Sequence, residues 1–283
     1  MPDGGSLEAR AFIEITRPHN CVLAGVVGLL GSIVAVGHFP ELSRALLVFL
    51  VVTLGCSAGN TINDYFDYEI DRINRPERPL PRGAMSRKTA FWYAMALFTI
   101  GLILASLINV YAFLLAVLAY TTMFLYAWKL KPLPFIGNLA VAGLTGATPL
   151  YGAIAVGKIG LAGYLALCAF LVNVAREVIK DIEDVEGDLT KGAKTLPIVV
   201  GKKKAAYVGA LFAFLTVIAS FLPIKAGVGL SYLAMVPVDA IILYSAFLIL
   251  RSQDRKTAHL SQKLLKISIF LAVMAFLIAS LVR

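Results

Sequence analysis

Long apolar runs are the feature that most constrains how this chain can fold. Nine runs of about 20 residues, the length that a helix needs to cross roughly 30 Å of hydrocarbon, follow one another along its 283 residues. Only 15% of the residues are charged, against about 25% in soluble domains. The sequence therefore predicts an all-α fold, a multispanning membrane bundle of nine transmembrane helices. The predicted spans are approximately 20–38, 45–62, 89–107, 110–128, 135–156, 161–178, 205–223, 229–250 and 264–282.

Basic residues between the runs predict the orientation in the membrane. The connections after the second, fourth, sixth and eighth runs are rich in Arg and Lys, whereas the alternate connections carry one basic residue or none. Because basic loops stay in the cytoplasm, we expect a multi-pass cell membrane protein with its N-terminus in the cytoplasm and its C-terminus outside. The polar motifs described below then face the cytoplasm.

Composition argues against several other classes of protein. The net charge of +9 comes from cations in short loops between runs, which is a topology signal and not a nucleic-acid site. Three cysteines within or beside the runs do not make a disulfide framework, and three scattered histidines do not make a zinc site. No linker divides the chain, so we expect a single intramembrane domain over residues 1–283. Membrane lipids surround it, and no feature indicates an obligate protein partner.

Two acidic stripes share one spacing, with steps of four, three and four residues. On a helix this spacing places four side chains within an arc of roughly 60°. The second stripe follows the first by 117 positions, which indicates an internal repeat. The first stripe consists of Asn60, Asp64, Asp67 and Asp71, and the second of Glu177, Asp181, Asp184 and Asp188.

The stripes predict a magnesium and diphosphate site. Carboxylate and amide oxygens are ligands that suit Mg²⁺, an ion that is usually shared with substrate phosphates. Arg and Lys in the following loops would supply further phosphate donors. Because the stripes lie where apolar runs end, a prenyl diphosphate fits both the site and the bundle. Metal would neutralise the leaving diphosphate while an aromatic side chain, for which Tyr126 is our candidate, stabilises the allylic cation.

The motifs resemble those of a known family, the UbiA superfamily of intramembrane prenyltransferases. The resemblance rests on TRPHN at 16–20, NDYFDYEID at 63–71 followed by RINRPERPLPRG, REVIKDIEDVEGD at 176–188 and TLP at 195–197. It covers nearly the whole chain. Within the superfamily, the second motif and the proline-rich loop are most similar to those of the archaeal branch that completes ether lipids. The homogentisate and chlorophyll branches share much of both motifs.

The resemblance implies a reaction and its partners. A geranylgeranyl group would pass from its diphosphate to the free hydroxyl of geranylgeranylglyceryl phosphate, forming the second ether bond of archaeal membrane lipids. A prenyl diphosphate and a lipid-like acceptor would be the substrates, and Mg²⁺ the required cofactor.

The resemblance also implies roles for particular residues. The metal ligands would be Asn60, Asp64, Asp181, Asp184 and Asp188. Arg72 and Lys129 are candidates for binding diphosphate, and Arg17 and Asn20 for binding the acceptor or its phosphate. The remaining members of the first stripe, Asp67 and Asp71, are candidates for accepting the proton of the acceptor hydroxyl, a hypothesis that rests on their place on the stripe and not on the resemblance.

The sequence leaves the roles of some residues undecided. Glu177 stands where Asn60 stands in the first stripe, and its role is undecided, as is that of Asp239 inside the eighth run. Either topology or diphosphate binding would explain Arg78 and Arg82.

The acceptor could instead be an aromatic ring. A cation transporter would also use two acidic stripes, but its ligands should lie near the middle of the membrane. A CDP-alcohol phosphotransferase needs an Asp-Gly string followed by Ala-Arg, which the chain lacks between its stripes.

Overall fold

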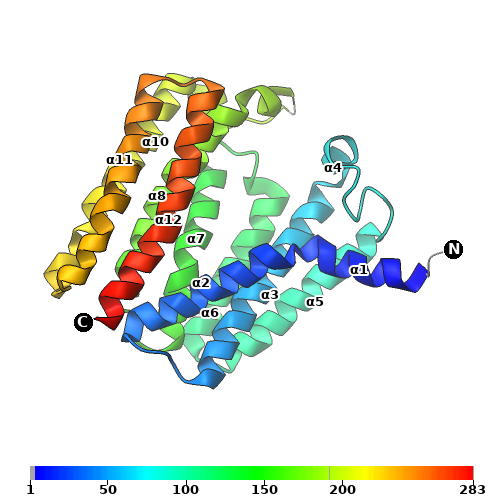
Figure 1. The fold of residues 1–283 in the computed structure, drawn as a ribbon. Coiled ribbons are helices and arrows are strands. Elements are labelled where there is room, and N and C mark those ends of the chain that lie inside the picture. The colour runs from blue at the N-terminus through cyan, green and yellow to red at the C-terminus, as the bar shows by residue number, and fades with distance from the viewer. Residues whose placement is uncertain (1–3, 191, 283) are drawn as a thin grey trace. The chain divides into compact units, whose positions relative to one another are not determined.

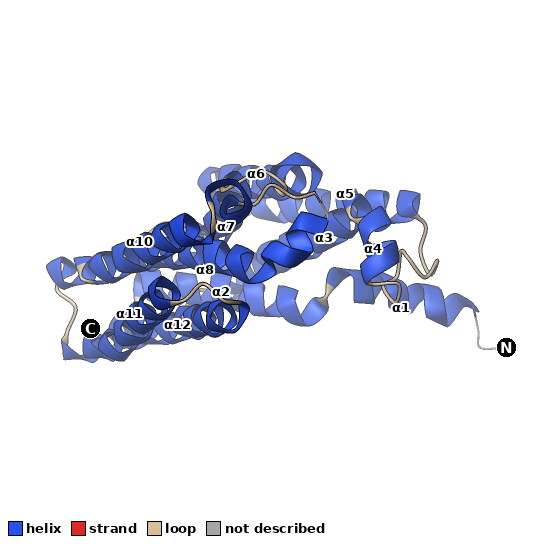
Figure 2. Cartoon of the chain, turned by 90° about the horizontal axis from the view of Figure 1, so that it is seen from above, coloured by secondary structure: helices blue, strands red, loops and turns tan. Residues whose placement is uncertain are grey.

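The structure is a computed structural model that describes residues 4–190 and 192–282, and every regular element in those residues is helical (Figures 1 and 2). Two of the short helices are 3₁₀ (η2 and η3) and one is a π-helix (η1). In chain order the elements are α1 Gly4–Thr16, α2 Pro18–Val36, α3 Leu42–Phe66, α4 Tyr68–Asn74, α5 Arg87–Ser106, α6 Val110–Leu125, η1 Tyr126–Leu130, α7 Ile136–Ala155, α8 Ala162–Thr190, α9 Leu196–Val200, α10 Lys202–Ser220, η2 Leu222–Ala226, η3 Leu230–Ala234, α11 Met235–Arg251 and α12 Arg255–Leu281.

The chain forms two compact units. The first unit comprises the residues up to Leu29 and Glu41–Trp128, and the second comprises Leu30–Pro40 and the residues from Lys129 onward. Helix α2 begins in the first unit and ends in the second. The first acidic stripe belongs to the first unit and the second stripe to the second unit. That the chain is one domain stays a prediction.

Helix α3 is the centre of the first unit and packs against α1, α5 and α6. Small residues allow this close packing, because a glycine lets a neighbouring side chain approach the backbone. The ring of Tyr120 from α6 lies against Gly55 of α3 and Gly101 of α5. Its hydroxyl donates a hydrogen bond of 2.7 Å to the carbonyl of Val51. This contact fixes the helix that carries the start of the first stripe.

Helix α8 is the centre of the second unit, where it packs against α7, α10 and α12. Its side chains Leu165, Ile179 and Ile182 are fully buried in the core of the unit. The last part of α2 belongs to this unit, and the hydroxyl of Ser32 donates to the carbonyl of Gly152 on α7 at 2.9 Å. The helix that carries the second stripe is therefore held on several sides.

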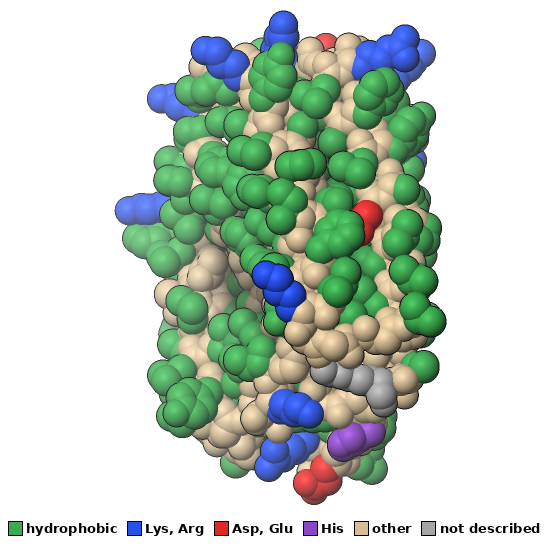
Figure 3. Space-filling view, turned by 90° about the vertical axis from the view of Figure 1, so that its left-hand side faces the viewer, with side chains coloured by type: hydrophobic (Ala, Val, Ile, Leu, Met, Phe, Trp, Pro, Cys, Tyr) green, Lys and Arg blue, Asp and Glu red, His purple; other side chains and the backbone are tan. Residues whose placement is uncertain are grey.

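The helices confirm a multi-pass membrane protein. Within the described residues, eight helices are long and apolar enough to cross a membrane, and hydrophobic side chains cover most of the face shown in Figure 3. These eight coincide with eight of the nine predicted spans. The remaining span is α7, whose 20 residues include Asn138, Thr145 and Pro149. The count of nine is therefore approximate.

Several helices extend beyond the apolar runs that predicted them. Helix α8 continues to Thr190, where the run ended near position 178, and α12 begins at Arg255, where the run began near 264. Hydropathy marks only the part of a helix that suits lipid, whereas backbone hydrogen bonding continues into polar sequence. At α12 the helix starts where the Asp254 carboxylate accepts a hydrogen bond from the backbone N–H of Thr257 at 2.9 Å.

Candidate active site

The first stripe runs across a helix junction. Helix α3 ends at Phe66, Asp67 lies at the junction, and Asp71 belongs to the short helix α4. The backbone N–H groups of Asp67 and Asp71 still bond to carbonyls four residues earlier, at 2.9 and 2.8 Å. Helical spacing is therefore kept across the junction, although the stripe does not lie on one uninterrupted helix as the spacing predicted.

A single arginine joins two carboxylates of the first stripe. The Arg78 guanidinium donates to Asp64 at 3.1 Å and to Asp71 at 2.5 Å. The side chains of Asp64 and Asp71 are only 4% and 8% exposed, and that of Arg78 is 15% exposed. Buried carboxylates require such compensation, because an unpaired buried charge is costly. Arg78, whose role the sequence left open, is thus part of this cluster.

A second arginine, which precedes the stripe in the sequence, contacts the Asp64 carboxylate. Arg17 lies between α1 and α2, and its guanidinium is paired with Asp64. It also donates to the amide oxygen of Asn60 at 3.5 Å, while the Asn60 amide nitrogen donates to the carbonyl of Thr16 at 2.9 Å. The φ of Arg17 is 53°, a left-handed conformation that is uncommon for residues other than glycine. Arg17, which the sequence predicted to bind the acceptor substrate, therefore contacts two predicted metal ligands, Asn60 and Asp64.

Other predicted residues of the first unit lie in different surroundings. The half-exposed Arg72 pairs with Glu69 one turn earlier on α4, at 3.4 Å. Asp67 accepts a hydrogen bond from the side-chain amide of Asn63 at 2.8 Å. Asn20 is exposed in the first turn of α2, and Tyr126 is partly buried in η1. Their places in the site stay predictions.

The second stripe lies on one uninterrupted helix, α8. Asp181 accepts a hydrogen bond of 2.8 Å from the side-chain amide of Asn138 on α7. Glu177 is paired with its neighbour Arg176, and Lys180 lies 4.0 Å from Asp184. Sequence reasoning missed Asn138, although an amide inside a predicted span is a signal, because polar groups in the membrane need partners.

Two further predicted site residues lie in the second unit and are at least partly exposed, whereas Asp239, whose role was open, is buried. Asp188 is partly buried near the end of α8, and Lys129 is exposed in η1. Asp239 is buried and accepts a hydrogen bond from the Ser220 hydroxyl at 2.9 Å. This contact joins α11 to α10, so Asp239 has a structural partner within its own unit.

The donor atoms of both stripes suit Mg²⁺ in kind. Carboxylate and amide oxygens are its usual protein ligands, and Mg²⁺ needs few of them because it keeps water and binds substrate phosphates. In the described residues, His, Cys, Asp and Glu do not gather into a group of three or more that could hold a metal ion by itself. In the first unit, Arg17 and Arg78 place two positive charges beside the Asp64 carboxylate. The residues fit a metal that is shared with a diphosphate.

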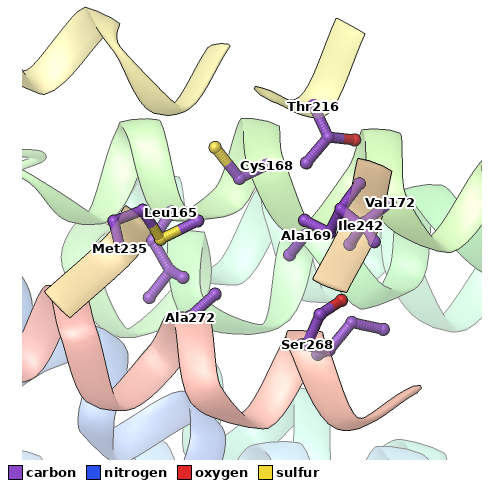
Figure 4. Close-up of a pocket in the computed structure, with 10 residues that line it drawn as sticks. Leu165, Cys168, Ala169, Val172, Thr216, Met235, Ile242, Ser268 and Ala272 are labelled. Atoms are coloured by element: carbon purple, nitrogen blue, oxygen red, sulfur yellow. The ribbon is translucent and has the colours of Figure 1, made fainter. Parts of the chain in front are cut away.

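An apolar pocket in the second unit lies apart from these residues (Figure 4). Its lining includes Leu165, Cys168 and Val172 of α8, and Met235 and Ile242 of α11. None of the predicted site residues is in its lining. It is a space between packed helices and carries no charged group.

Comparison with known proteins assigns the family. The UbiA prenyltransferase family matches residues 24–281. Digeranylgeranylglyceryl phosphate synthase of Thermococcus kodakarensis is 79% identical over 277 residues, which cover 98% of this chain and 100% of that protein. The solved structure of a digeranylgeranylglyceryl phosphate synthase is 36% identical, with a TM-score of 0.91 and coverage of 98% and 99%. A UbiA homologue from Archaeoglobus fulgidus, solved with GPP and Mg²⁺, has the same fold at 19% identity, with a TM-score of 0.72 and coverage of 94% and 99%. The chain therefore belongs to the UbiA prenyltransferase family.

Proposed function

We propose that this chain transfers a geranylgeranyl group from geranylgeranyl diphosphate to the hydroxyl of geranylgeranylglyceryl phosphate, forming the second ether bond of archaeal membrane lipids. The observation that carries the proposal is the 79% identity, over 98% of this chain, to the Thermococcus kodakarensis enzyme. The buried cluster of carboxylates and arginines supports it, because a diphosphate and its metal need both kinds of group.

The reaction needs the diphosphate to leave with the electron pair of the allylic C–O bond. Mg²⁺, held by the Asn and Asp residues assigned above, would neutralise charge on the leaving diphosphate. The chain itself would supply Arg72, Lys129 and Arg78 as phosphate donors. Tyr126 would face the allylic cation with its ring. Arg17 and Asn20 would bind the phosphate of the acceptor, so that its hydroxyl lies close to the cation.

The acceptor hydroxyl then forms a new C–O bond and loses its proton to a carboxylate. Asp67 or Asp71 would take that proton, since both belong to the first stripe. A strong base is unnecessary, because a carbocation is electrophilic enough for a neutral alcohol to attack. Full turnover with normal metal affinity in both Asp67→Asn and Asp71→Asn would contradict this assignment.

The alternation of basic loops supports an active site that faces the cytoplasm. In this orientation the N-terminus is cytoplasmic and the C-terminus is outside. Both stripes then open toward the compartment that supplies Mg²⁺ and prenyl diphosphate. This orientation is part of the proposal.

The proposal is tested by product analysis. Purified protein is incubated with geranylgeranyl diphosphate, Mg²⁺ and a mixture of geranylgeranylglyceryl phosphate and aromatic acceptors, and products are identified by mass spectrometry. We expect a digeranylgeranyl ether, its loss on chelation of Mg²⁺, and its loss in Asp64→Asn and Asp181→Asn. Asp254→Asn is the matched control, because Asp254 caps α12 and Asn caps helices equally well.

Other products would redirect the assignment. A prenylated aromatic ring would place the chain in another branch of the family. Absence of product with every acceptor would contradict prenyl transfer, and cation flux into vesicles that contain the protein would then favour a transporter.

A further inference from the structure

An ion pair outside both stripes joins two separate segments of the first unit. Glu14, in the last turn of α1, accepts two hydrogen bonds from the Arg82 guanidinium, at 2.8 and 2.7 Å. Arg82 belongs to the connection of residues 75–86 between α4 and α5. This two-point geometry sets orientation as well as distance, because the planar guanidinium matches the carboxylate.

Both partners of this ion pair are close in sequence to the arginines that contact Asp64. Glu14 precedes Arg17 by three residues, and the backbone N–H of Arg17 donates to the carbonyl of Glu14 at 3.1 Å. Arg82 follows Arg78 by four residues, and its backbone N–H donates to the carbonyl of Arg78, also at 3.1 Å. The pair therefore joins the two turns that present these arginines.

The side chain of Arg82 also holds the turn that carries Arg78. Its guanidinium donates to the backbone carbonyl of Glu77 at 2.8 Å, next to Arg78. The hydrogen bond from the same guanidinium lowers the pKa of Glu14 below its ordinary value, which favours the ionised carboxylate. Two arginines thus contact Asp64, and the chain segments that carry them are joined by one further ion pair, between Glu14 and Arg82.

The pair is not what keeps α1 folded against the unit. Apolar side chains of α1, the connection and α5 form a small core of their own, and Phe12 packs against Tyr93 with ring centres 5.0 Å apart. The buried members of this core are Ala11, Ile15, Leu80, Met85 and Ala90. Because Glu14 and Arg82 are each more than a third exposed, their pair should contribute little to stability.

We propose that Glu14 and Arg82 are positioning residues, which act by holding Arg17 and Arg78 in place on the first stripe. The assignment rests on the proposed function, since it concerns how the chain presents cations to a diphosphate. Glu14 and Arg82 need not touch the substrate themselves. Their effect on catalysis should therefore exceed their effect on stability.

The test compares Glu14→Gln and Arg82→Gln with the charge-reversed double variant Glu14→Arg/Arg82→Glu. In each single variant we expect kcat/KM to fall by roughly tenfold or more, because small displacements of positioning groups are costly in catalysis. The apparent melting temperature should change little. The double variant should recover part of the loss, because it restores the ion pair but not the bond to the Glu77 carbonyl. Glu41→Gln is the control, since it also neutralises an exposed carboxylate of the first unit, one that accepts a hydrogen bond from the Ser43 hydroxyl at 2.7 Å instead of from an arginine.

Binding of inorganic pyrophosphate with Mg²⁺, measured by calorimetry, separates this inference from the proposed function. The single variants should bind pyrophosphate more weakly than the wild-type protein, and Glu41→Gln should bind it as tightly as the wild type. If the wild type forms no ether product, the proposed function fails while this binding comparison still tests the positioning role. Unchanged pyrophosphate affinity in both single variants would overturn the inference. So would losses that follow the melting temperature without any recovery in the double variant.

Discussion

Arg78 is the residue on which the first stripe most depends for charge compensation. It contacts Asp64 and Asp71, and all three side chains are largely buried. Arg72, which sequence reasoning favoured for diphosphate binding, pairs instead with Glu69 where both side chains are more than half exposed. Two arginines six positions apart therefore stand in different environments, and they should respond differently to substitution.

We predict that Arg78→Gln lowers the free energy of unfolding by about 3 kcal/mol, because it leaves a buried carboxylate without its cation. Arg72→Gln should change it by less than about 1 kcal/mol, since exposed ion pairs contribute little. The measurement is denaturant unfolding in detergent without Mg²⁺. Equal losses of stability in the two variants would contradict the prediction that removing the buried arginine costs more than removing the exposed one.

The site depends on how closely the helices that carry it approach one another. A Cβ atom added to Gly55 of α3 would lie 2.2 Å from the Tyr120 ring, which is buried and held by its hydroxyl. A Cβ atom added to Gly59, one turn later, would lie 3.1 Å from the sulfur of Met123. A thioether side chain adapts more readily than a ring. The two glycines thus form a matched pair on one helix.

We predict that Gly55→Ala destabilises the protein by about 1–3 kcal/mol through overpacking. Gly59→Ala should be nearly neutral, because Met123 can move and alanine favours the helix over glycine. Thermal unfolding in detergent compares the two variants. A larger loss of stability for Gly59→Ala would show that the tight contact lies at α6 Met123 and not at Tyr120.

The number of spans decides on which side of the membrane each connection lies. Helix α7 is the one predicted span that falls outside the eight apolar helices of the described residues. Lys131 precedes it and Lys158 follows it, and both are exposed. If α7 crosses the membrane, these two lysines lie on opposite sides.

We predict that Lys131→Cys reacts with a membrane-impermeant thiol reagent from the cytoplasmic side only, and Lys158→Cys from the outside only. Sealed vesicles of both orientations provide the measurement. The wild-type protein is the background control, since Cys21 and Cys168 are buried and Cys56 is partly buried. Labelling of both positions from one side would mean that α7 does not span.

Some features of this protein follow from sequence because they are local. A run of apolar residues selects a helix in lipid wherever it occurs, since every backbone polar group must be satisfied within the segment. Spacing within one helix likewise predicts which side chains share a face. These arguments yielded the all-helical fold, the two stripes and the character of their ligands, and the family resemblance followed from the same motifs.

Other features were decided by tertiary structure because they join residues that are distant in sequence. Arg17 and Asp64 are 47 positions apart, and Asn138 and Asp181 are 43 apart. Hydropathy and helical spacing describe residues that are close in sequence, so they do not predict such pairs. The pairing of Glu14 with Arg82 also depends on how α1 and the connection after α4 pack together. The sequence alone determined which chemical groups line the ends of the helices, whereas the packing of separate segments decided which cation meets which carboxylate.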